Sequence, residues 1–232
     1  MRLRRRRIFT TVLTDRRTVA QDTLEVSLAR PRDFAFAAGQ HLQVRVPTLL
    51  HADRRGPSRV FSIASSPFDE QHLRIAFRET GSGFKRTLRA LEIGSELRIE
   101  GPHGFSTLPR DPARPVVLVA GGIGVTPYMS MLRGLHESHD DGPPITLLYG
   151  NRSSRTAAYV DELDDLARSE PQLTLRKHSG LMDEAAIRRS VEGRDSTWFV
   201  SGPPPMVDGV RSALHVLGVR ASRVHVEEFL GY

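Results

Sequence analysis

The sequence predicts two domains, a six-stranded antiparallel β-barrel followed by an α/β domain with a Rossmann-like parallel five-stranded sheet. Up to about Glu100, short segments alternate apolar and polar residues, as strands with one face in a core do. Beyond Pro115, short apolar runs alternate with segments of helical spacing, which favours parallel strands joined by right-handed crossovers. Because a proline-punctuated link separates the two patterns, the predicted domains are residues 1–108 and 109–232.

The first half is expected to form a small barrel closed by one short helix. A helix is expected between the fifth and sixth strands, because Phe84, Leu88 and Leu91 share one helical face and Ser82 is placed to cap its start. The six expected strands are Ile8–Thr14, Leu24–Leu28, Leu42–Val46, Arg59–Ser65, Leu73–Phe77 and Leu97–Ile99.

The second half is expected to bind its ligands beyond the carboxyl ends of its strands. The expected strands are Val116–Ala120, Ile145–Tyr149, Leu173–Arg176, Trp198–Val200 and Val224–Val226. Four helices are expected between them: one that starts near Thr126, and those near Ala157–Arg168, Glu184–Val191 and Met206–Leu217.

A glycine loop joins the first of these strands to its helix. The spacing is Gly122-x-Gly124-x-x-Pro127, with Thr126 placed to cap the helix and Pro127 where a missing N–H is tolerated. Glycines there let the backbone approach an anion held at the helix N-terminus. Taken alone, the loop fits a nucleotide site or an ordinary strand-to-helix turn.

Composition excludes several classes of function. The chain of 232 residues has no cysteine, so it carries neither a disulfide nor a Cys-ligated metal site or cluster. No apolar run reaches the ~20 residues of a membrane span, and no signal peptide is evident, so a cytoplasmic location is expected. The net charge is +6, and the arginine block within Arg2–Arg7 fits a solvated arm better than a nucleic-acid site.

The glycine loop and three other stretches carry a family resemblance. "RVFSIASSP" from Arg59, "GPHGFSTLP" from Gly101, "GGIGVTP" from Gly121 and "SGPPPMV" from Ser201 occur in this order. Together they resemble the ferredoxin–NADP⁺ reductase-like family of flavin oxidoreductases, over nearly the whole chain. The resemblance implies FAD, favoured over FMN, and NADPH or NADH as the electron donor. The histidines, including His103, show no metal-ligand spacing, so no metal site is expected.

The resemblance assigns the flavin to the barrel. Arg59 would pair with its phosphates, Phe61 would lie on the isoalloxazine ring, and Ser62 would hydrogen-bond N5, with Val60 part of the same motif. The family more often has tyrosine at Phe61, so this site lacks a phenolic hydroxyl. The second phosphate-binding segment would be Ser82, Gly83, Phe84 and Lys85, where Lys85 takes the place of a hydroxyl residue.

The resemblance assigns the nicotinamide dinucleotide to the second domain. Gly122, Gly124 and Thr126 would lie near its pyrophosphate, and Ser201, Gly202 and Pro203 would close over the nicotinamide. Ser201 stands where the family often has cysteine. After the second strand, Arg152 and Arg155 favour NADPH, because arginine pairs with a 2′-phosphate, although both could be plain surface charge.

The C-terminal "VEEFLGY" would reach the flavin. Phe229 and Tyr232 would shield the ring, while an ordinary terminal tail is the alternative for Tyr232. Glu227 would relay a proton, so Ser62, Ser201 and Glu227 are the predicted catalytic residues.

The predicted function is therefore hydride transfer from NAD(P)H to FAD, with electrons passed to a separate acceptor. That acceptor would be a ferredoxin, a haem protein, an oxygenase component or a small molecule. The alternatives are a flavin reductase or diaphorase acting on free flavin or quinone, and a non-catalytic flavin-binding regulatory protein. The oligomeric state is not predicted.

Overall fold

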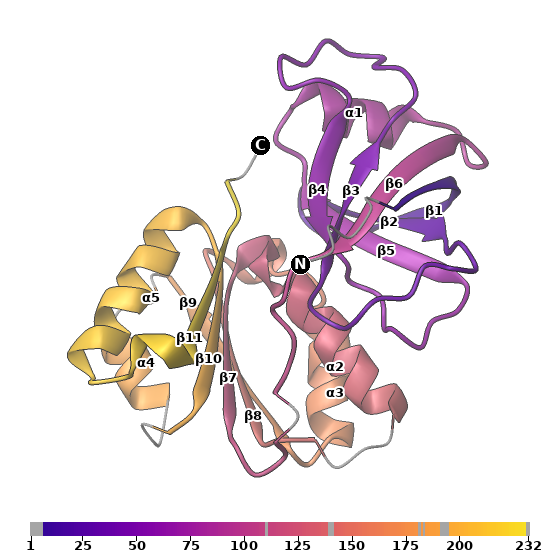
Figure 1. Cartoon of the computed structure of the whole chain (residues 1–232). Helices are drawn as coiled ribbons and strands as arrows, with labels where there is room; N and C mark the ends of the chain where they lie inside the picture. Colours follow the sequence, from indigo (N-terminus) through magenta and orange to yellow (C-terminus); the bar gives the residue numbers. More distant parts are fainter. Residues whose placement is uncertain are drawn as a thin grey trace.

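The computed structural model describes residues 7–109, 111–138, 142–180, 182, 184–190 and 195–230. Its strands form two sheets, one antiparallel with six strands and one parallel with five (Figure 1). The antiparallel sheet comes first along the chain and the parallel sheet second, as the sequence predicts. The two-domain fold class is therefore confirmed. The link between the sheets lies between His103 and Val116, and the boundary at residue 108 stays a prediction. No helix of the described residues is long and apolar enough to cross a membrane.

The N-terminal sheet closes into a barrel. Its strands run in the order β4-β3-β6-β1-β2-β5, and the bridge Ile63 to Ile75 joins the two edge strands. The apolar side chains of alternate strand positions fill the interior, together with Phe84 and Leu88 of the helix. The elements are β1 (Ile8–Ala20), β2 (Thr23–Ala29), β3 (His41–Arg45), β4 (Ser58–Ser62), β5 (His72–Arg78), α1 (Gly83–Ala90) and β6 (Glu96–His103).

Strand β1 is longer than the sequence predicts. Its first residues, Ile8–Val12, pair with β6, whereas Leu13–Ala20 pair with β2. The polar stretch after Leu13 breaks the alternation of apolar and polar residues, so the strand predicted from this alternation ends at Thr14. Pairing with β2 satisfies the backbone of the extension instead.

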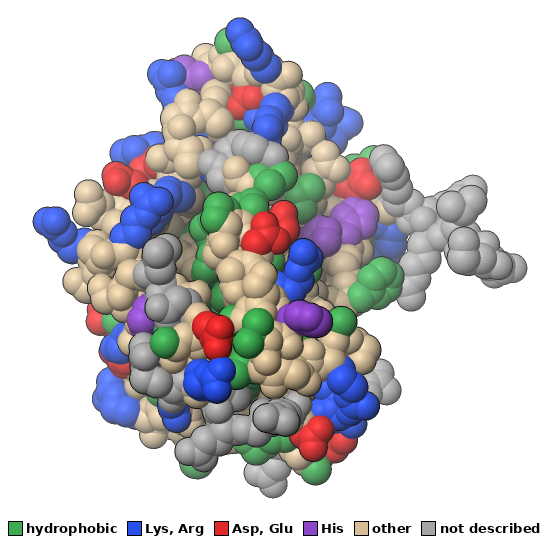
Figure 2. Space-filling view, turned by 90° about the vertical axis from the view of Figure 1, so that its left-hand side faces the viewer, with side chains coloured by type: hydrophobic (Ala, Val, Ile, Leu, Met, Phe, Trp, Pro, Cys, Tyr) green, Lys and Arg blue, Asp and Glu red, His purple; other side chains and the backbone are tan. Residues whose placement is uncertain are grey.

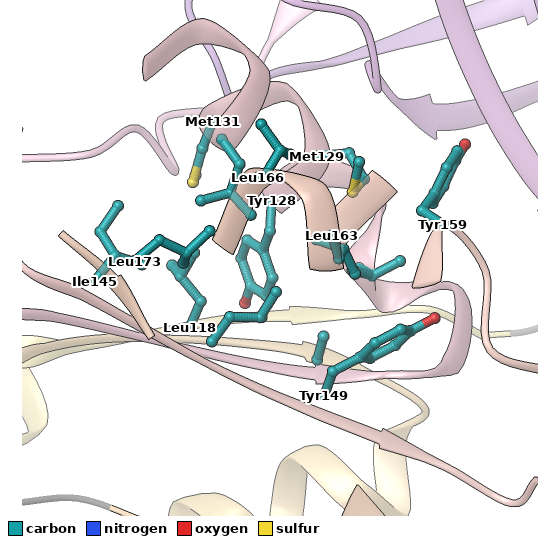
Figure 3. Close-up of a cluster of buried hydrophobic side chains, with 14 of the residues drawn as sticks. Leu118, Tyr128, Met129, Met131, Ile145, Tyr149, Tyr159, Leu163, Leu166 and Leu173 are labelled. Atoms are coloured by element: carbon teal, nitrogen blue, oxygen red, sulfur yellow. The ribbon is translucent and has the colours of Figure 1, made fainter. Parts of the chain in front are cut away.

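The parallel sheet has the order β11-β10-β7-β8-β9 and helices on both faces (Figure 1). Helices α2 and α3 cover one face, over the cluster that contains Tyr128, Leu163 and Tyr149 (Figure 3). Helices α4 and α5 cover the other, around Trp198 and Ile187. The elements are β7 (Val116–Gly121), α2 (Thr126–Ser138), β8 (Ile145–Asn151), α3 (Val160–Ser169), β9 (Leu173–Ser179), α4 (Glu184–Ser190), β10 (Thr197–Gly202), α5 (Pro204–Val216) and β11 (Val224–Glu228).

A buried network of charges joins the two domains. Glu25 on β2, with a side chain 2% exposed, accepts a hydrogen bond of 2.8 Å from the Tyr159 hydroxyl and lies 3.7 Å from Arg133 of α2. Arg133 also pairs in bidentate fashion with Glu162, and donates to the Ala64 carbonyl of the barrel at 2.7 Å. Because desolvated charges need partners, this network fixes how the barrel sits against α2 and α3.

Candidate active site

A cavity of about 440 Å³ opens between the barrel and the carboxyl end of the parallel sheet. In Figure 2, hydrophobic side chains gather in the middle of one face of the molecule, with acidic and histidine side chains beside them. The walls come from β3, β4 and β5, from the first turn of α1, from the loop after β7 and from the C-terminal strand and tail. Segments far apart in the chain therefore meet at one place.

The predicted flavin motif on β4 forms one wall of this cavity. All four residues from Arg59 to Ser62 line it, although Val60 is exposed and Phe61 is buried. The ring of Phe61 also packs against Phe77 and Phe84, at centroid distances of 5.8 and 6.0 Å. Phe61 thus belongs to the barrel core as well as to the cavity wall, and its stacking on a flavin stays a prediction.

The structure brings two of the predicted catalytic residues together. The Ser62 hydroxyl lies 3.5 Å from Glu227 Oε1, although 165 residues separate them in the chain. Burial raises the pKa of Glu227, and the hydrogen bond from Ser62 opposes that rise. A carboxyl with a raised pKa keeps its proton up to a higher pH than an exposed carboxyl does, which suits proton transfer.

The third predicted catalytic residue, Ser201, lies outside this contact. It is the register partner of Glu227 on the neighbouring strand, but it does not line the cavity. Its hydroxyl oxygen is buried, and no hydrogen-bond partner is found for it among the described residues. A buried polar atom without a partner is unfavourable, which marks the strand end at Ser201 as a place that a ligand could complete.

The start of α1 differs from the prediction. Ser82 caps the helix as expected, since its hydroxyl accepts the Lys85 N–H at 3.3 Å. The Phe84 N–H, however, donates to the Asp53 carboxylate at 2.8 Å. Two of the three N–H groups predicted to hold a pyrophosphate, those of Phe84 and Lys85, therefore already have partners. The partner of Phe84 is a carboxylate that comes from a neighbouring loop.

Side-chain cations line the cavity near α1. Lys85 and Arg78 are both among the lining residues, and the Lys85 ammonium donates to the Thr80 hydroxyl at 3.1 Å. Burial lowers the pKa of Lys85 to about 8, with further contributions from Arg59 and Arg78. Crowded cations in a partly desolvated place favour an anionic ligand, as the sequence predicts for Lys85.

The glycine loop after β7 serves internal packing. A Cβ on Gly124 would lie 2.6 Å from the Ser201 carbonyl carbon and 2.9 Å from Gly202 Cα, so glycine lets this loop lie directly on β10. Gly122 instead adopts a positive φ of 54°, with open space around it. Thr126 is the first residue of α2, where its hydroxyl donates to the Ile123 carbonyl, so its predicted role as a cap is wrong.

The remaining nucleotide-site residues lie at the same end of the sheet. Gly202 packs against Gly121, since a Cβ on Gly202 would lie 3.2 Å from the Gly121 Cα, and Pro203 precedes α5. Arg152 and Arg155 are exposed after β8, as predicted, and the Arg155 carbonyl accepts a hydrogen bond from Gln21 of the barrel. Their predicted contact with a 2′-phosphate stays a prediction.

The C-terminal tail borders the cavity as expected. Phe229 lines it and donates its N–H to the Gly202 carbonyl at 2.8 Å, which ties the tail to the end of β10. Tyr232 lies outside the described residues.

Sequence reasoning missed several lining residues. His41 and Gln43 of β3, Ala76 and Arg78 of β5, and Arg55 all line the cavity. Arg78 directly follows the predicted strand Leu73–Phe77, and that position could have indicated it. The others have no local signal, because only the closure of the barrel brings β3 and β5 beside β4.

The cavity suits a flavin. Apolar side chains from β4 and β5 form its middle, Ser62 and Glu227 supply polar groups, and Arg59, Arg78 and Lys85 supply positive charge. Arg59 Nε is buried without a hydrogen-bond partner among the described residues, so one N–H group of Arg59 remains for a ligand to accept from. The donor set thus fits a ring system that carries phosphates.

Comparison with known proteins agrees with this chemistry. An oxidoreductase FAD-binding domain matches residues 10–107, and an oxidoreductase NAD-binding domain matches residues 118–212. The chain is 32% identical over 208 residues to the ferredoxin reductase component of 3-ketosteroid-9-alpha-monooxygenase from Mycobacterium tuberculosis, covering 86% of this chain and 56% of that protein. It is also 32% identical to the flavohemoprotein of Bordetella pertussis, covering 84% of this chain and 53% of that protein.

The chain therefore spans little more than half the length of these two relatives. Among solved structures, the cytochrome P450 reductase GcoB of Amycolatopsis has the same fold, with a TM-score of 0.81, 24% identity, and coverage of 97% of this chain and 70% of that one. With its FAD-binding barrel followed by its NAD-binding domain, the chain belongs to the ferredoxin reductase-like family of oxidoreductases.

Proposed function

We propose that this chain is the reductase module of an electron-transfer system, which takes hydride from NAD(P)H and passes electrons to a separate acceptor. The observation that carries the proposal is the shared cavity. It brings the Arg59–Ser62 motif of the FAD-binding domain against Thr126 of the NAD-binding domain and the Glu227–Leu230 tail.

Each wall of the cavity has a role in this proposal. FAD supplies the hydride acceptor and can release the two electrons singly. Arg59 and Lys85 neutralise its phosphates, and Phe61 excludes water from the ring. Ser62 orients the reacting edge by a hydrogen bond, and Glu227 holds a proton next to Ser62, at a contact of 3.5 Å.

The acceptor is proposed to be a separate redox protein. The chain has no cysteine, so a Cys-ligated cluster has to lie outside these 232 residues. The relative from Mycobacterium tuberculosis is named as the ferredoxin reductase component of a monooxygenase, which supports an oxygenase-linked role.

NADPH is the proposed donor. Arg152 and Arg155 are exposed at the carboxyl end of β8, where an adenosine 2′-phosphate would be recognised. Replacing both with Gln should raise the KM for NADPH about tenfold or more and leave the KM for NADH within about twofold. Equal changes for the two dinucleotides would refute the assignment.

The function is tested with purified protein that has been loaded with FAD. Anaerobic NADPH should bleach the flavin absorbance, and the reduced protein should then reduce an added ferredoxin or cytochrome c. The variant Ser62→Ala should keep FAD and lose at least about tenfold in the rate of flavin reduction, since one oriented hydrogen bond is removed. A protein that binds FAD and both dinucleotides without any bleaching would contradict the proposal.

A further inference from the structure

A carboxylate of the protein itself already lies among the donors that a flavin phosphate needs. Asp53 accepts a hydrogen bond of 2.8 Å from the Phe84 N–H in the first turn of α1, through Oδ2. Its other oxygen lies 2.5 Å from Arg59 Nη2. The Asp53 side chain is 7% exposed and that of Arg59 9% exposed, so the pair is buried.

Asp53 belongs to the loop 46–57, between β3 and β4, which is docked on α1. The N–H groups of Leu50 and His51 donate to the Thr87 hydroxyl at 3.0 and 3.3 Å. The His51 carbonyl would lie 2.6 Å from a Cβ on Gly83, so the loop covers the first residue of the helix. The start of α1, where backbone donors favour an anion, is therefore closed by this loop.

Arg59 is turned toward the same loop. Its Nη1 donates to the carbonyls of Gly56 and Ser58 at 3.1 and 2.6 Å, and its Nη2 pairs with Asp53. Its Nε is buried with no partner among the described residues. Both terminal nitrogens of this guanidinium thus already have partners in the loop and at the start of β4, and the remaining donor is unsatisfied.

From this geometry we propose that Asp53 is an internal competitor for the flavin phosphate, which holds Arg59 and the start of α1 until the phosphate displaces it. The inference rests on the proposed flavin site. Asp53 carries the charge of the ligand it replaces, and it satisfies a main-chain donor and a guanidinium as a phosphate oxygen would. It does not line the cavity, whereas Arg59, Arg78 and Lys85 do.

All three cations line the cavity, and of these three Arg59 is the one that Asp53 holds. Arg59 joins the phosphate only after it leaves Asp53, so part of the binding free energy goes into that exchange. The apparent affinity is then the intrinsic affinity multiplied by the fraction of protein in which Arg59 is released. FAD is then held less tightly than the three cations would hold it without Asp53.

The test compares flavins with and without a phosphate. Asp53→Asn keeps an oxygen for the Phe84 N–H and removes the charge that holds Arg59. Binding of FAD, FMN and riboflavin to the apoprotein is followed by quenching of flavin fluorescence. We expect FAD and FMN to bind about tenfold more tightly to the variant, and riboflavin to bind as it does to the wild type.

The matched control is Asp208→Asn, because Asp208 is an exposed carboxylate on α5, 3.6 Å from Arg211, and it lies outside the cavity lining. It should leave all three affinities unchanged. In a double-mutant cycle with Arg59→Gln, the gain from Asp53→Asn should vanish, since no guanidinium remains to be released. Should Asp53→Asn fail to fold, Asp53→Ser still offers an acceptor to the Phe84 N–H and replaces it in every comparison.

Unchanged or weaker FAD binding to the Asp53 variants would overturn the proposal and make Asp53 a residue that positions Arg59. An equal gain for riboflavin would overturn it too, because the effect would then not depend on the phosphate. If neither the wild type nor the variants bind any flavin, the proposed function itself fails, and that result is distinct from the other two.

Discussion

Replacing Gly124 with Ala tests whether the glycine loop is required by packing within the protein. A Cβ at this position would meet the main chain of β10, 2.6 Å from the Ser201 carbonyl carbon and 2.9 Å from Gly202 Cα. Atoms of the backbone cannot rotate away as a flexible side chain can, so either the loop or the strand end has to shift. We therefore expect the NAD-binding domain to lose stability even with no nucleotide present.

The magnitude follows from the kind of collision. Overpacking of a well-packed interior typically destabilises by ~1–3 kcal/mol, and contact with three main-chain atoms places Gly124→Ala at roughly 3 kcal/mol. For a chain of this size, that corresponds to a fall in Tm of about 6–12 °C. The control is Gly209→Ala on α5, where nothing lies within 4 Å of the added Cβ. That change should stabilise by about 0.5–1 kcal/mol, because Ala favours a helix over Gly.

Unfolding can be followed by the fluorescence of Trp198. It is the single tryptophan of the chain, it is 1% exposed, and it lies on β10, three residues before Ser201. Urea denaturation of the wild type and of both variants gives the difference in the free energy of unfolding. A Gly124→Ala protein within about 0.5 kcal/mol of the wild type would refute the packing argument and return the loop to a purely ligand-binding role.

Four further predictions concern titratable and charged groups. FAD affinity should fall above pH 8 by up to about tenfold per pH unit, because burial lowers the pKa of Lys85 to about 8 and only the charged ammonium pairs with phosphate. Fluorescence titrations with FAD from pH 6 to 10 measure this dependence on pH. The variant Lys85→Met should abolish it. Because the pKa of Lys85 is lower in the folded protein than in the unfolded chain, Lys85 binds more protons in the unfolded chain above pH 8. The contribution of Lys85 to the free energy of unfolding should therefore rise with pH in that range. Arg133→Met should destabilise by about 1–3 kcal/mol in urea denaturation, because the Ala64 carbonyl loses its donor while Glu25 keeps Arg17 and Tyr159 as partners. Arg168→Met on the surface should change stability by less than about 1 kcal/mol. Burial raises the pKa of Glu227, so the rate of flavin reduction should change with pH at a pKa above the ordinary carboxyl range. The variant Glu227→Gln should lack this change. An identical pH profile in the variant would exclude Glu227 as the titrating group.

The sequence by itself determined the two domains and most of their elements. Alternation with a period of two specifies which strand face enters a core, and this signal is local, so β2, β3 and β5 could be predicted from a few residues each. The same holds for α1, whose cap at Ser82 is read from its own first turn. The extension of β1 to Ala20 could not be read, because its polar residues are held by pairing with β2.

At the site, the motif from Arg59 to Ser62 and the tail at Glu227 were also evident, since residue type there reflects the ligand chemistry that the family resemblance implies. Tertiary structure alone decided what surrounds them. Asp53 reaches Arg59 and Phe84 because a loop folds over α1, and Glu227 reaches Ser62 across 165 residues because the domains pack together. Charges that are buried by long-range packing must find partners wherever the fold brings them, and no local pattern in the chain specifies those partners.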